Sequence, residues 1–231
     1  MKNFLREENV DFFKNIKLIN NVPVKVAMID TGIDTNNPFF SQLNISNVND
    51  IQYDWHGTAV ASVIAMTNRK TIIRNYGQER MNVRDLPGLI EQAISDRNSV
   101  INISMNTLVN AEIREYRVLI DTLNNLIKNS DVRVVVAAGN DNLDLDCLEK
   151  EKLYLIPAML DGVITVGALG YKNKGRASYS NHGKRVNIYL PGGEVDYQIT
   201  VAGSNKENKC YGTSISAGIA SGLISGGFDL C

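Results

Sequence analysis

The chain has 231 residues, 44% of them hydrophobic, and its 24 Lys and Arg residues balance its 25 Asp and Glu residues to a net charge of −1. Such a charge provides no long-range field for nucleic acid or an anionic membrane surface, so neither is expected as a partner. The length and composition favour a single domain over residues 1–231 that buries one large core.

The first 21 residues contain charged side chains throughout and no apolar signal-peptide core. No segment approaches the roughly 20 apolar residues that a membrane-spanning helix needs. The three cysteines, Cys147, Cys210 and Cys231, lack metal-ligand spacing, which favours reduced thiols. We therefore expect a cytoplasmic protein in which the apolar side chains of residues 1–21 dock this segment on the domain surface.

Strands and helices are expected to alternate along the chain. Residues 24–29 are apolar on both faces, as in a central parallel strand covered by helices, whereas residues 34–50 are rich in Asn and Ser and predict a surface loop. The remaining expected elements are helices at 56–66, 83–97 and 112–129, strands at 71–74, 100–105, 131–138 and 163–168, an acidic loop at 142–152, a hairpin of 198–202 with 209–211, and a helix from Ser214. This order predicts an α/β fold with a mostly parallel sheet.

Ser214 lies among small residues at the start of its predicted helix. There a serine hydroxyl meets the unpaired N–H groups and the positive dipole end of the helix, which suits a nucleophile, but serine is also a common helix N-cap. A nucleophilic serine needs a base and a carboxylate that orients the base. The chain has two histidines, His56 before an apolar helix and His182 in a polar turn, and Asp30 follows the first strand. Carboxylate, imidazole and hydroxyl then follow one of the known chain orders of the triad, for which subtilisin is the standard example.

Four ordered segments resemble the subtilisin-like serine proteases. They are Ile29–Asp34 around the aspartate, His56–Ala61 around the histidine, Gly212–Ala217 around the serine and Val134–Asn140, a strand that ends in the family's oxyanion-hole asparagine. The resemblance implies a three-layer, doubly wound sheet with helices on both faces. It also implies a serine endopeptidase in which Ser214 is the nucleophile, His56 the base, Asp30 its orienting carboxylate and Asn140 the oxyanion donor.

The same resemblance implies that an extended peptide or protein substrate contacts two segments. These segments supply Ser104, Met105, Asn106, Ala138 and Gly139. Where the family has two glycines, this chain has Asn106 and Thr107, which are expected to narrow the primary specificity pocket. The chemistry needs no cofactor or metal, and calcium binding by Asp34 or Asp50 is left open.

The chain differs from the usual family pattern in three further respects. Gly218 stands where the family usually has proline, and only 17 residues follow Ser214, which implies a shortened C-terminus. Asp30 comes too early for a folded inhibitory pro-domain before it, so we expect another means of restraint, such as a regulatory partner or inhibitor, and a restricted substrate.

Three alternatives are weighed against this interpretation. An aspartic protease would need a second Asp-Thr-Gly or Asp-Ser-Gly, which the chain lacks. An esterase or lipase of the α/β-hydrolase kind would need a histidine after the serine, and none follows Ser214. A non-catalytic, protease-like module that binds peptides or a partner remains open.

Overall fold

The computed structural model describes residues 17–19, 22–80, 82–170, 175–203 and 206–230. Its central sheet has seven strands in the spatial order β2-β3-β1-β4-β6-β8-β9, and every neighbouring pair runs parallel. These strands are β1 (Lys25–Ile29), β2 (Asn44–Asn47), β3 (Ile72–Asn75), β4 (Val100–Ile103), β6 (Arg133–Ala137), β8 (Val163–Leu169) and β9 (Ile188–Pro191). Two antiparallel pairs stand apart from it, β5 (Thr107–Asn110) with β7 (Leu153–Ile156) and β10 (Ile199–Gly203) with β11 (Lys206–Cys210).

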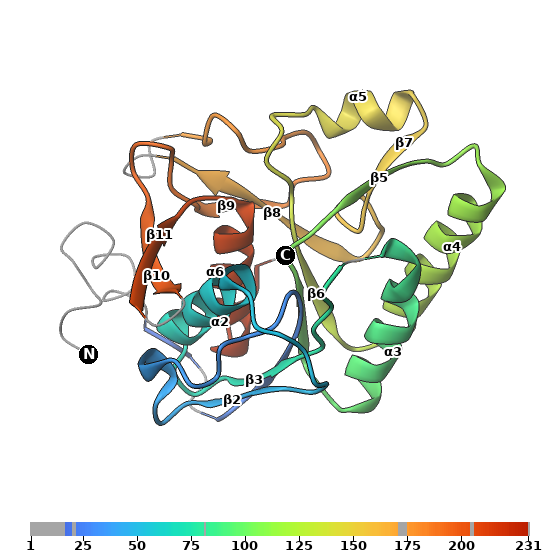
Figure 1. Cartoon of the computed structure of the whole chain (residues 1–231). Coiled ribbons are helices and arrows are strands. Elements are labelled where there is room, and N and C mark those ends of the chain that lie inside the picture. Colours follow the sequence, from blue (N-terminus) through green and yellow to red (C-terminus); the bar gives the residue numbers. More distant parts are fainter. Residues whose placement is uncertain (1–16, 20–21, 81, 171–174, 204–205, 231) are drawn as a thin grey trace.

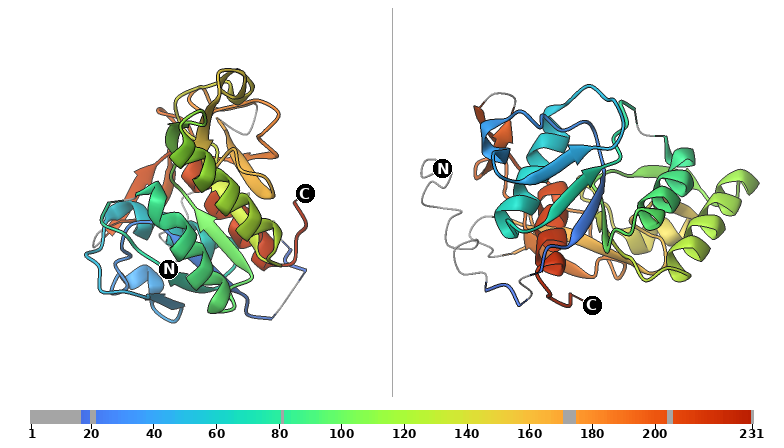
Figure 2. Two further views of the ribbon diagram at one scale, coloured as in Figure 1. Left: turned by 90° about the vertical axis from the view of Figure 1, so that its right-hand side faces the viewer. Right: turned by 90° about the horizontal axis from the view of Figure 1, so that it is seen from below.

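Helices cover both faces of this sheet. On one face lie α2 (Trp55–Thr67) and α6 (Thr213–Ser225), and on the other lie α3 (Leu86–Ser95) and α4 (Arg114–Lys128), an arrangement seen in Figure 1 and in the turned views of Figure 2. Alternate strand residues divide between the two faces, because successive side chains of a strand point in opposite directions. Val26 and Met28 of β1 therefore pack with α2 and α6, whereas Ala27 and Ile29 pack with α3 and α4. The predicted three-layer, doubly wound α/β fold is confirmed.

Helices α2 and α6 are apolar or small around almost their whole circumference, which is typical of helices buried on all sides. One side of each packs against the sheet. The opposite side packs against the β10–β11 hairpin, where Val63 of α2, Ile219 of α6 and Val201 of β10 share a second core. This packing on two sides fixes the positions of both helices, whose starts carry His56 and Ser214.

Two segments that the sequence predicted as loops contain helices or strands in the structure. The predicted loop at 34–50 contains a 3-10 turn, Pro38–Phe40, and the edge strand β2, which tolerates Asn and Ser because one of its sides carries no neighbouring strand. Its Phe40 is buried and anchors the segment in the core. The predicted acidic loop at 142–152 contains the short helix α5 (Leu145–Lys150), which begins because the side chain of Asp144 accepts a hydrogen bond from the Asp146 N–H.

Most of the predicted N-terminal docking segment, residues 1–16, 20 and 21, lies outside the described residues. Within its described part, the Ile19 N–H donates to the Gly226 carbonyl at 2.9 Å, just beyond the end of α6. Among the helices that the structure describes, none combines the length and the apolar character needed to cross a bilayer.

Candidate active site

The polar residues of interest gather where the winding of the sheet reverses. After β1 the chain builds β2 and β3 on one side of it, then crosses to build β4, β6, β8 and β9 on the other side. The carboxyl ends of β1 and β4 thus form the topological switch point, where open α/β sheets place their sites. Asp30 directly follows β1, and Ser104 directly follows β4.

Asp30 and His56 form the best-defined contact at this edge. The Nδ1 atom of His56 lies 2.7 Å from Oδ1 of Asp30, and this Asp30 oxygen also accepts the Thr31 N–H at 2.7 Å. The Asp30 carboxylate is fully buried, and no described residue bonds its Oδ2 atom. A buried carboxylate beside Nδ1 favours the tautomer that carries its proton there, which leaves Nε2 free to accept one.

The surroundings of His56 shift its acid–base behaviour. Burial lowers the pKa of the His56 imidazole, but the charge of Asp30, the hydrogen bond to it and the charge of Asp54 together outweigh burial and raise this pKa above 6.5. A base whose pKa lies near the working pH is suited to accept a proton and return it.

On the other side of the imidazole, Nε2 lies 3.2 Å from the hydroxyl oxygen of Ser214. This hydroxyl is also 3.3 Å from the Ser104 carbonyl oxygen. Ser214 is the second residue of α6 and not its cap, because Gly212 occupies the N-cap with φ of 148°, a conformation that only glycine adopts readily. The Ser214 N–H belongs to the first helical turn and has no partner within the helix.

Asn140 is held beside Ser214 by one residue of α6. Its Oδ1 atom accepts both the N–H and the hydroxyl of Thr213, each at 2.9 Å, and the Thr213 hydroxyl in turn accepts the Gly139 N–H at 3.1 Å. Because two donors fix the oxygen, the orientation of the amide is determined, and no described residue accepts from Nδ2. The side-chain NH₂ group is therefore free to bind an anionic oxygen that forms next to Ser214.

A cavity of about 250 Å³ adjoins Ser214 on the side of Ser104. Four of the five predicted substrate-contact residues line it, together with other residues of three segments. The lining residues are Ser104, Met105, Asn106, Ala137, Gly139, Asn140, Asp141, Leu155, Thr213 and Ser214. Ala138 differs from the prediction, because its fully buried side chain packs in the core of the α3–α4 face, and its neighbour Ala137 lines the cavity instead.

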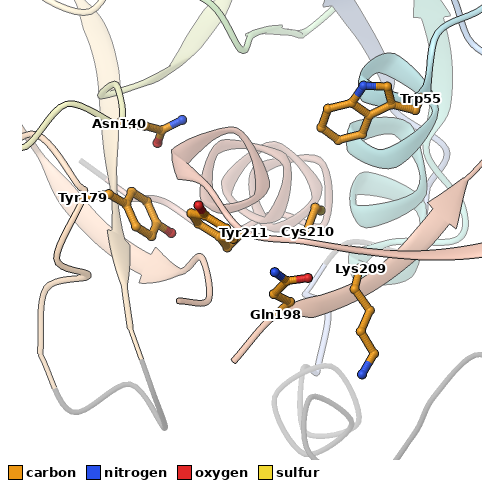
Figure 3. Close-up of a pocket in the computed structure, with 7 residues that line it drawn as sticks. All are labelled: Trp55, Asn140, Tyr179, Gln198, Lys209, Cys210 and Tyr211. Atoms are coloured by element: carbon orange, nitrogen blue, oxygen red, sulfur yellow. The ribbon is translucent and has the colours of Figure 1, made fainter. Parts of the chain in front are cut away.

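Asn140 also lines a second cavity, of about 450 Å³, whose lining residues are drawn in Figure 3. It is lined by Trp55, Asn140, Tyr179, Gln198, Lys209, Cys210 and Tyr211. Burial raises the pKa of the Cys210 thiol to about 12, so this thiol is uncharged at neutral pH. Of these residues, only Asn140 was predicted from the sequence as part of the site. This cavity could have been inferred from two aromatic residues close to the predicted site in sequence, Trp55 beside His56 and Tyr211 near Ser214.

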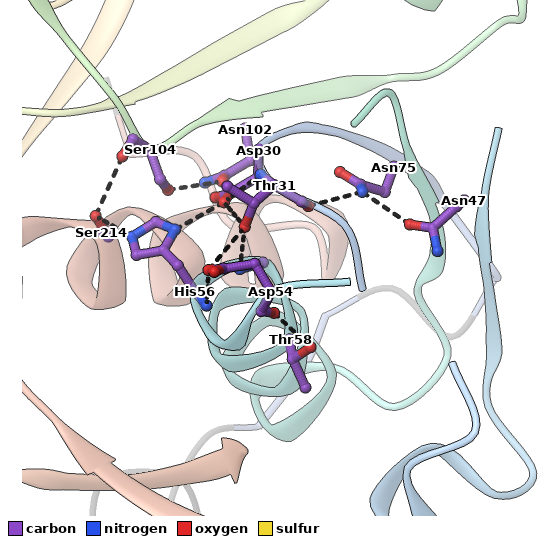
Figure 4. A network of polar contacts seen from close by, with 11 residues as sticks. Asp30, Thr31, Asn47, Asp54, His56, Thr58, Asn75, Asn102, Ser104 and Ser214 are labelled. Carbon is purple, nitrogen blue, oxygen red and sulfur yellow. Dashed lines mark hydrogen bonds and ion pairs between the residues drawn. The ribbon is translucent and has the colours of Figure 1, made fainter. Parts of the chain in front are cut away.

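Sequence reasoning also missed the polar shell around His56, drawn in Figure 4. Asp54 caps α2 by accepting the His56 N–H at 2.9 Å, and the same oxygen lies 3.3 Å from the Thr31 hydroxyl. The Thr31 hydroxyl also accepts the Gly57 N–H at 2.9 Å. This shell ties the end of β1 to the start of α2 and so fixes the imidazole against Asp30. An acidic residue just before an apolar helix was the signal for the cap.

The two residues considered for calcium, Asp34 and Asp50, differ in their surroundings. Asp34 is buried and accepts the Asn36 N–H in a local turn, and Asp50 is exposed. No cluster of three or more His, Cys, Asp or Glu side chains suited to a metal ion occurs among the described residues.

A buried carboxylate, an imidazole and a hydroxyl in a hydrogen-bonded line, beside a free amide donor on a parallel α/β sheet, define the class of serine hydrolases with the subtilisin order of residues. A model of the subtilase family, Peptidase_S8, matches residues 23–225. The chain therefore belongs to the subtilase family.

The chain is similar to proteases of known sequence and structure. A subtilisin-like protease of Coccidioides posadasii is 28% identical over 218 residues, covering 86% of this chain and 49% of the relative. The major intracellular serine protease of Bacillus subtilis is 27% identical over 227 residues, covering 87% and 67%. The epidermin leader peptide processing serine protease of Staphylococcus aureus superposes with a TM-score of 0.77 at 25% identity, covering 90% and 65%. The chain spans about half the length of the fungal relatives that it matches.

Proposed function

We propose that this chain is a serine endopeptidase with Ser214 as nucleophile, His56 as general base and acid, Asp30 as the orienting carboxylate and Asn140 as an oxyanion donor. One observation carries the proposal: His56 bridges a buried carboxylate at 2.7 Å and a hydroxyl at 3.2 Å through its two ring nitrogens. A structural histidine needs only one such partner, whereas catalysis needs both.

The chemistry proceeds in two halves. Ser214 Oγ attacks the peptide carbonyl carbon while His56 Nε2 takes its proton, and the carbonyl oxygen becomes an oxyanion that the Asn140 Nδ2 and Ser214 N–H groups stabilise. His56 then donates the proton to the leaving amine, the C–N bond breaks, and an acyl-enzyme remains. Water attacks the acyl-enzyme in the same way, and the acid product leaves Ser214 with its proton restored.

We further propose a restricted peptide or protein substrate, bound as an extended strand along Ser104–Asn106. Two similar proteins support the proposed substrate and location. One is named for processing a leader peptide, and the other is named an intracellular protease. A peptide leader or precursor in the cytoplasm, cut by a single peptidase domain over residues 1–231, is the proposed context. A regulatory partner or inhibitor is the proposed means of restraint.

A fluorophosphonate probe tests the proposal, because it forms a covalent bond only with an activated serine. We expect the wild-type chain to be labelled and Ser214→Ala to lose labelling. Ser216→Ala is the matched control, since Ser216 lies in the same helix but donates to the Leu190 carbonyl at 3.0 Å and not to His56. A folded wild-type chain that takes no label would contradict the proposal and favour the non-catalytic binding module.

A further inference from the structure

Two asparagines of neighbouring strands reach the turn that follows Asp30 (Figure 4). Asn47 of β2 and Asn75 of β3 are directly paired in the parallel register of the sheet. Their side chains are joined by a 2.9 Å hydrogen bond from Nδ2 of Asn75 to Oδ1 of Asn47. Neither asparagine was predicted from the sequence as part of the site, and neither contacts His56 or Ser214 through a hydrogen bond.

Asn75 fixes the backbone of Thr31. Its Nδ2 donates to the Thr31 carbonyl at 2.9 Å. The Thr31 N–H donates at 2.7 Å to the same Asp30 oxygen that contacts His56. A Cβ atom at Gly57 would overlap the Thr31 carbonyl oxygen, so the backbone of α2 lies against this oxygen while Asn75 binds it from β3. The orientation of Thr31, and with it that of the Asp30 carboxylate, therefore depends on Asn75.

Asn47 holds the next part of the same turn. Its Oδ1 accepts the Ile33 N–H at 3.0 Å, and its Nδ2 donates to the Ile33 carbonyl at 2.9 Å. One side chain thus satisfies both backbone groups of Ile33, as a neighbouring strand would. Because Oδ1 of Asn47 also accepts from Asn75, the two carboxamides form one hydrogen-bonded unit that supports the turn.

The position of Asn75 is an unfavourable one for a polar side chain. Asn75 is fully buried at the end of β3, although asparagine is a poor strand former, and no described residue donates to its Oδ1 atom. A buried acceptor without a partner lowers stability. Ile73, two residues earlier on the same face of β3, is apolar and packs in the core between the sheet and α2. A carboxamide at this position therefore needs a reason other than packing, and its bond to Thr31 provides one.

We propose that Asn75, supported by Asn47, is a positioning residue for the buried carboxylate of Asp30. It acts through the backbone of Thr31 and keeps the carboxylate directed at the imidazole of His56. The inference rests on the proposed function and adds to it a support that comes from β2 and β3 and touches neither the substrate nor the reacting atoms.

The rate of fluorophosphonate labelling, measured against pH and scaled to the fraction of chain finally labelled, tests the proposal. Asn75→Leu keeps the branched shape and removes both donated hydrogen bonds. We expect labelling about tenfold slower at the plateau of the pH profile, because a displaced carboxylate orients the base poorly. Asp30 and Asp54 are the charged groups that raise the pKa of His56. A weaker contact with Asp30 lowers this pKa, so the acidic limb of the profile should move to lower pH.

Asn98→Leu is the matched control. Asn98 is also buried, and its Oδ1 atom also has no partner among the described residues. Its Nδ2 donates to the Tyr76 hydroxyl and to the Ala93 carbonyl, each at 2.8 Å. Asn98 precedes β4 and so lies at the opposite end of the parallel sheet from Asp30. The same substitution there should leave the scaled labelling rate and the acidic limb at their wild-type values.

A wild-type rate in Asn75→Leu would overturn the inference, as would a slower rate with an unmoved acidic limb or an equal loss of rate in Asn98→Leu. If Asn75→Leu does not fold, Asn47→Ala, at a partly exposed position, should show the same two changes to a smaller extent. Wild-type behaviour of Asn47→Ala would then overturn the inference. A wild-type chain that labels while the variants match it contradicts the inference alone. A folded wild-type chain that takes no label contradicts the proposed function, and the inference falls with it.

Discussion

Asp54 and His56 are joined by a 2.9 Å hydrogen bond from the His56 backbone N–H to the Asp54 carboxylate, which brings a second negative charge near the imidazole besides Asp30. Asp54 has two separable effects. As a helix cap it holds the first turn of α2, and as a charge it helps to raise the pKa of His56.

The first prediction separates these effects with Asp54→Asn. Asparagine caps helices about as well as aspartate, so the fold and the position of His56 should be kept while the charge is lost. The proposed base must be neutral to accept a proton, so activity falls as pH drops through the pKa of His56. Losing the charge lowers this pKa, and the acidic limb of the pH–kcat/KM profile should move to lower pH.

Asp54→Ala removes both the charge and the cap. It should show the same displacement of the acidic limb and, in addition, a loss of about 1 kcal/mol of stability measured by urea denaturation. An acidic limb that stays at the wild-type pH in Asp54→Asn, in a variant of normal stability, would show that the Asp54 charge does not act on His56.

The second prediction concerns the amide of Asn140. Asn140→Asp retains an oxygen that accepts from Thr213 but replaces the free NH₂ group with an oxygen that repels an oxyanion. We expect kcat to fall by about 10²–10³ in Asn140→Ala, a range that comes from subtilisin itself, and by at least as much in Asn140→Asp, with little change in KM. Steady-state kinetics on the cognate peptide measures both.

These two variants distinguish a role of Asn140 in stabilising the oxyanion from a role in holding Thr213 at the start of α6. If Asn140 served only to hold Thr213 at the start of α6, Asn140→Asp would keep that contact and retain its activity. Near-normal kcat in Asn140→Asp would therefore remove Asn140 from the proposed oxyanion site.

The third prediction tests the contact between α2 and α6, on which the placement of both His56 and Ser214 depends. A Cβ atom at Gly222 would lie 2.5 Å from Cβ of Thr67, whereas one at Gly218 would meet its nearest neighbour at 3.4 Å. Gly222→Ala should therefore force the helices apart and destabilise the fold by about 1–3 kcal/mol. Gly218→Ala, the matched control, should change stability by less than this and gain up to about 1 kcal/mol of helix propensity.

Urea denaturation followed by circular dichroism measures both glycine variants. Equal midpoints for Gly218→Ala and Gly222→Ala would mean that the two helices tolerate separation, and the tight contact would not be what positions the site.

Much of the architecture was readable from residue patterns. The apolar run that became β1, the helix after His56 and the amphipathic spacing of Ile120, Leu123 and Ile127 in α4 all gave elements that the structure confirms. The prediction of a loop over residues 34–50 was wrong, because some of its Asn and Ser residues lie in the edge strand β2. Pairing with β3 there outweighs their low strand propensity. The prediction of a loop over residues 142–152 was wrong, because the side chain of Asp144 caps the short helix α5. A helix of this length is too short for hydrophobic periodicity to reveal.

The sequence by itself determined which chemical groups this protein carries and the order in which they occur, since short motifs around Asp30, His56, Asn140 and Ser214 are local properties of the chain. It also determined the α/β class and the central strand that helices cover on both faces, because hydrophobic periodicity reflects which faces are buried. Only the tertiary structure decided that Asn106 bridges Ala137 and Ala158, that Ala138 turns away from the cavity, and that a second cavity forms around Trp55 and Tyr211. These contacts join residues from distant parts of the chain, and their distances are set by packing between elements, which no local pattern encodes.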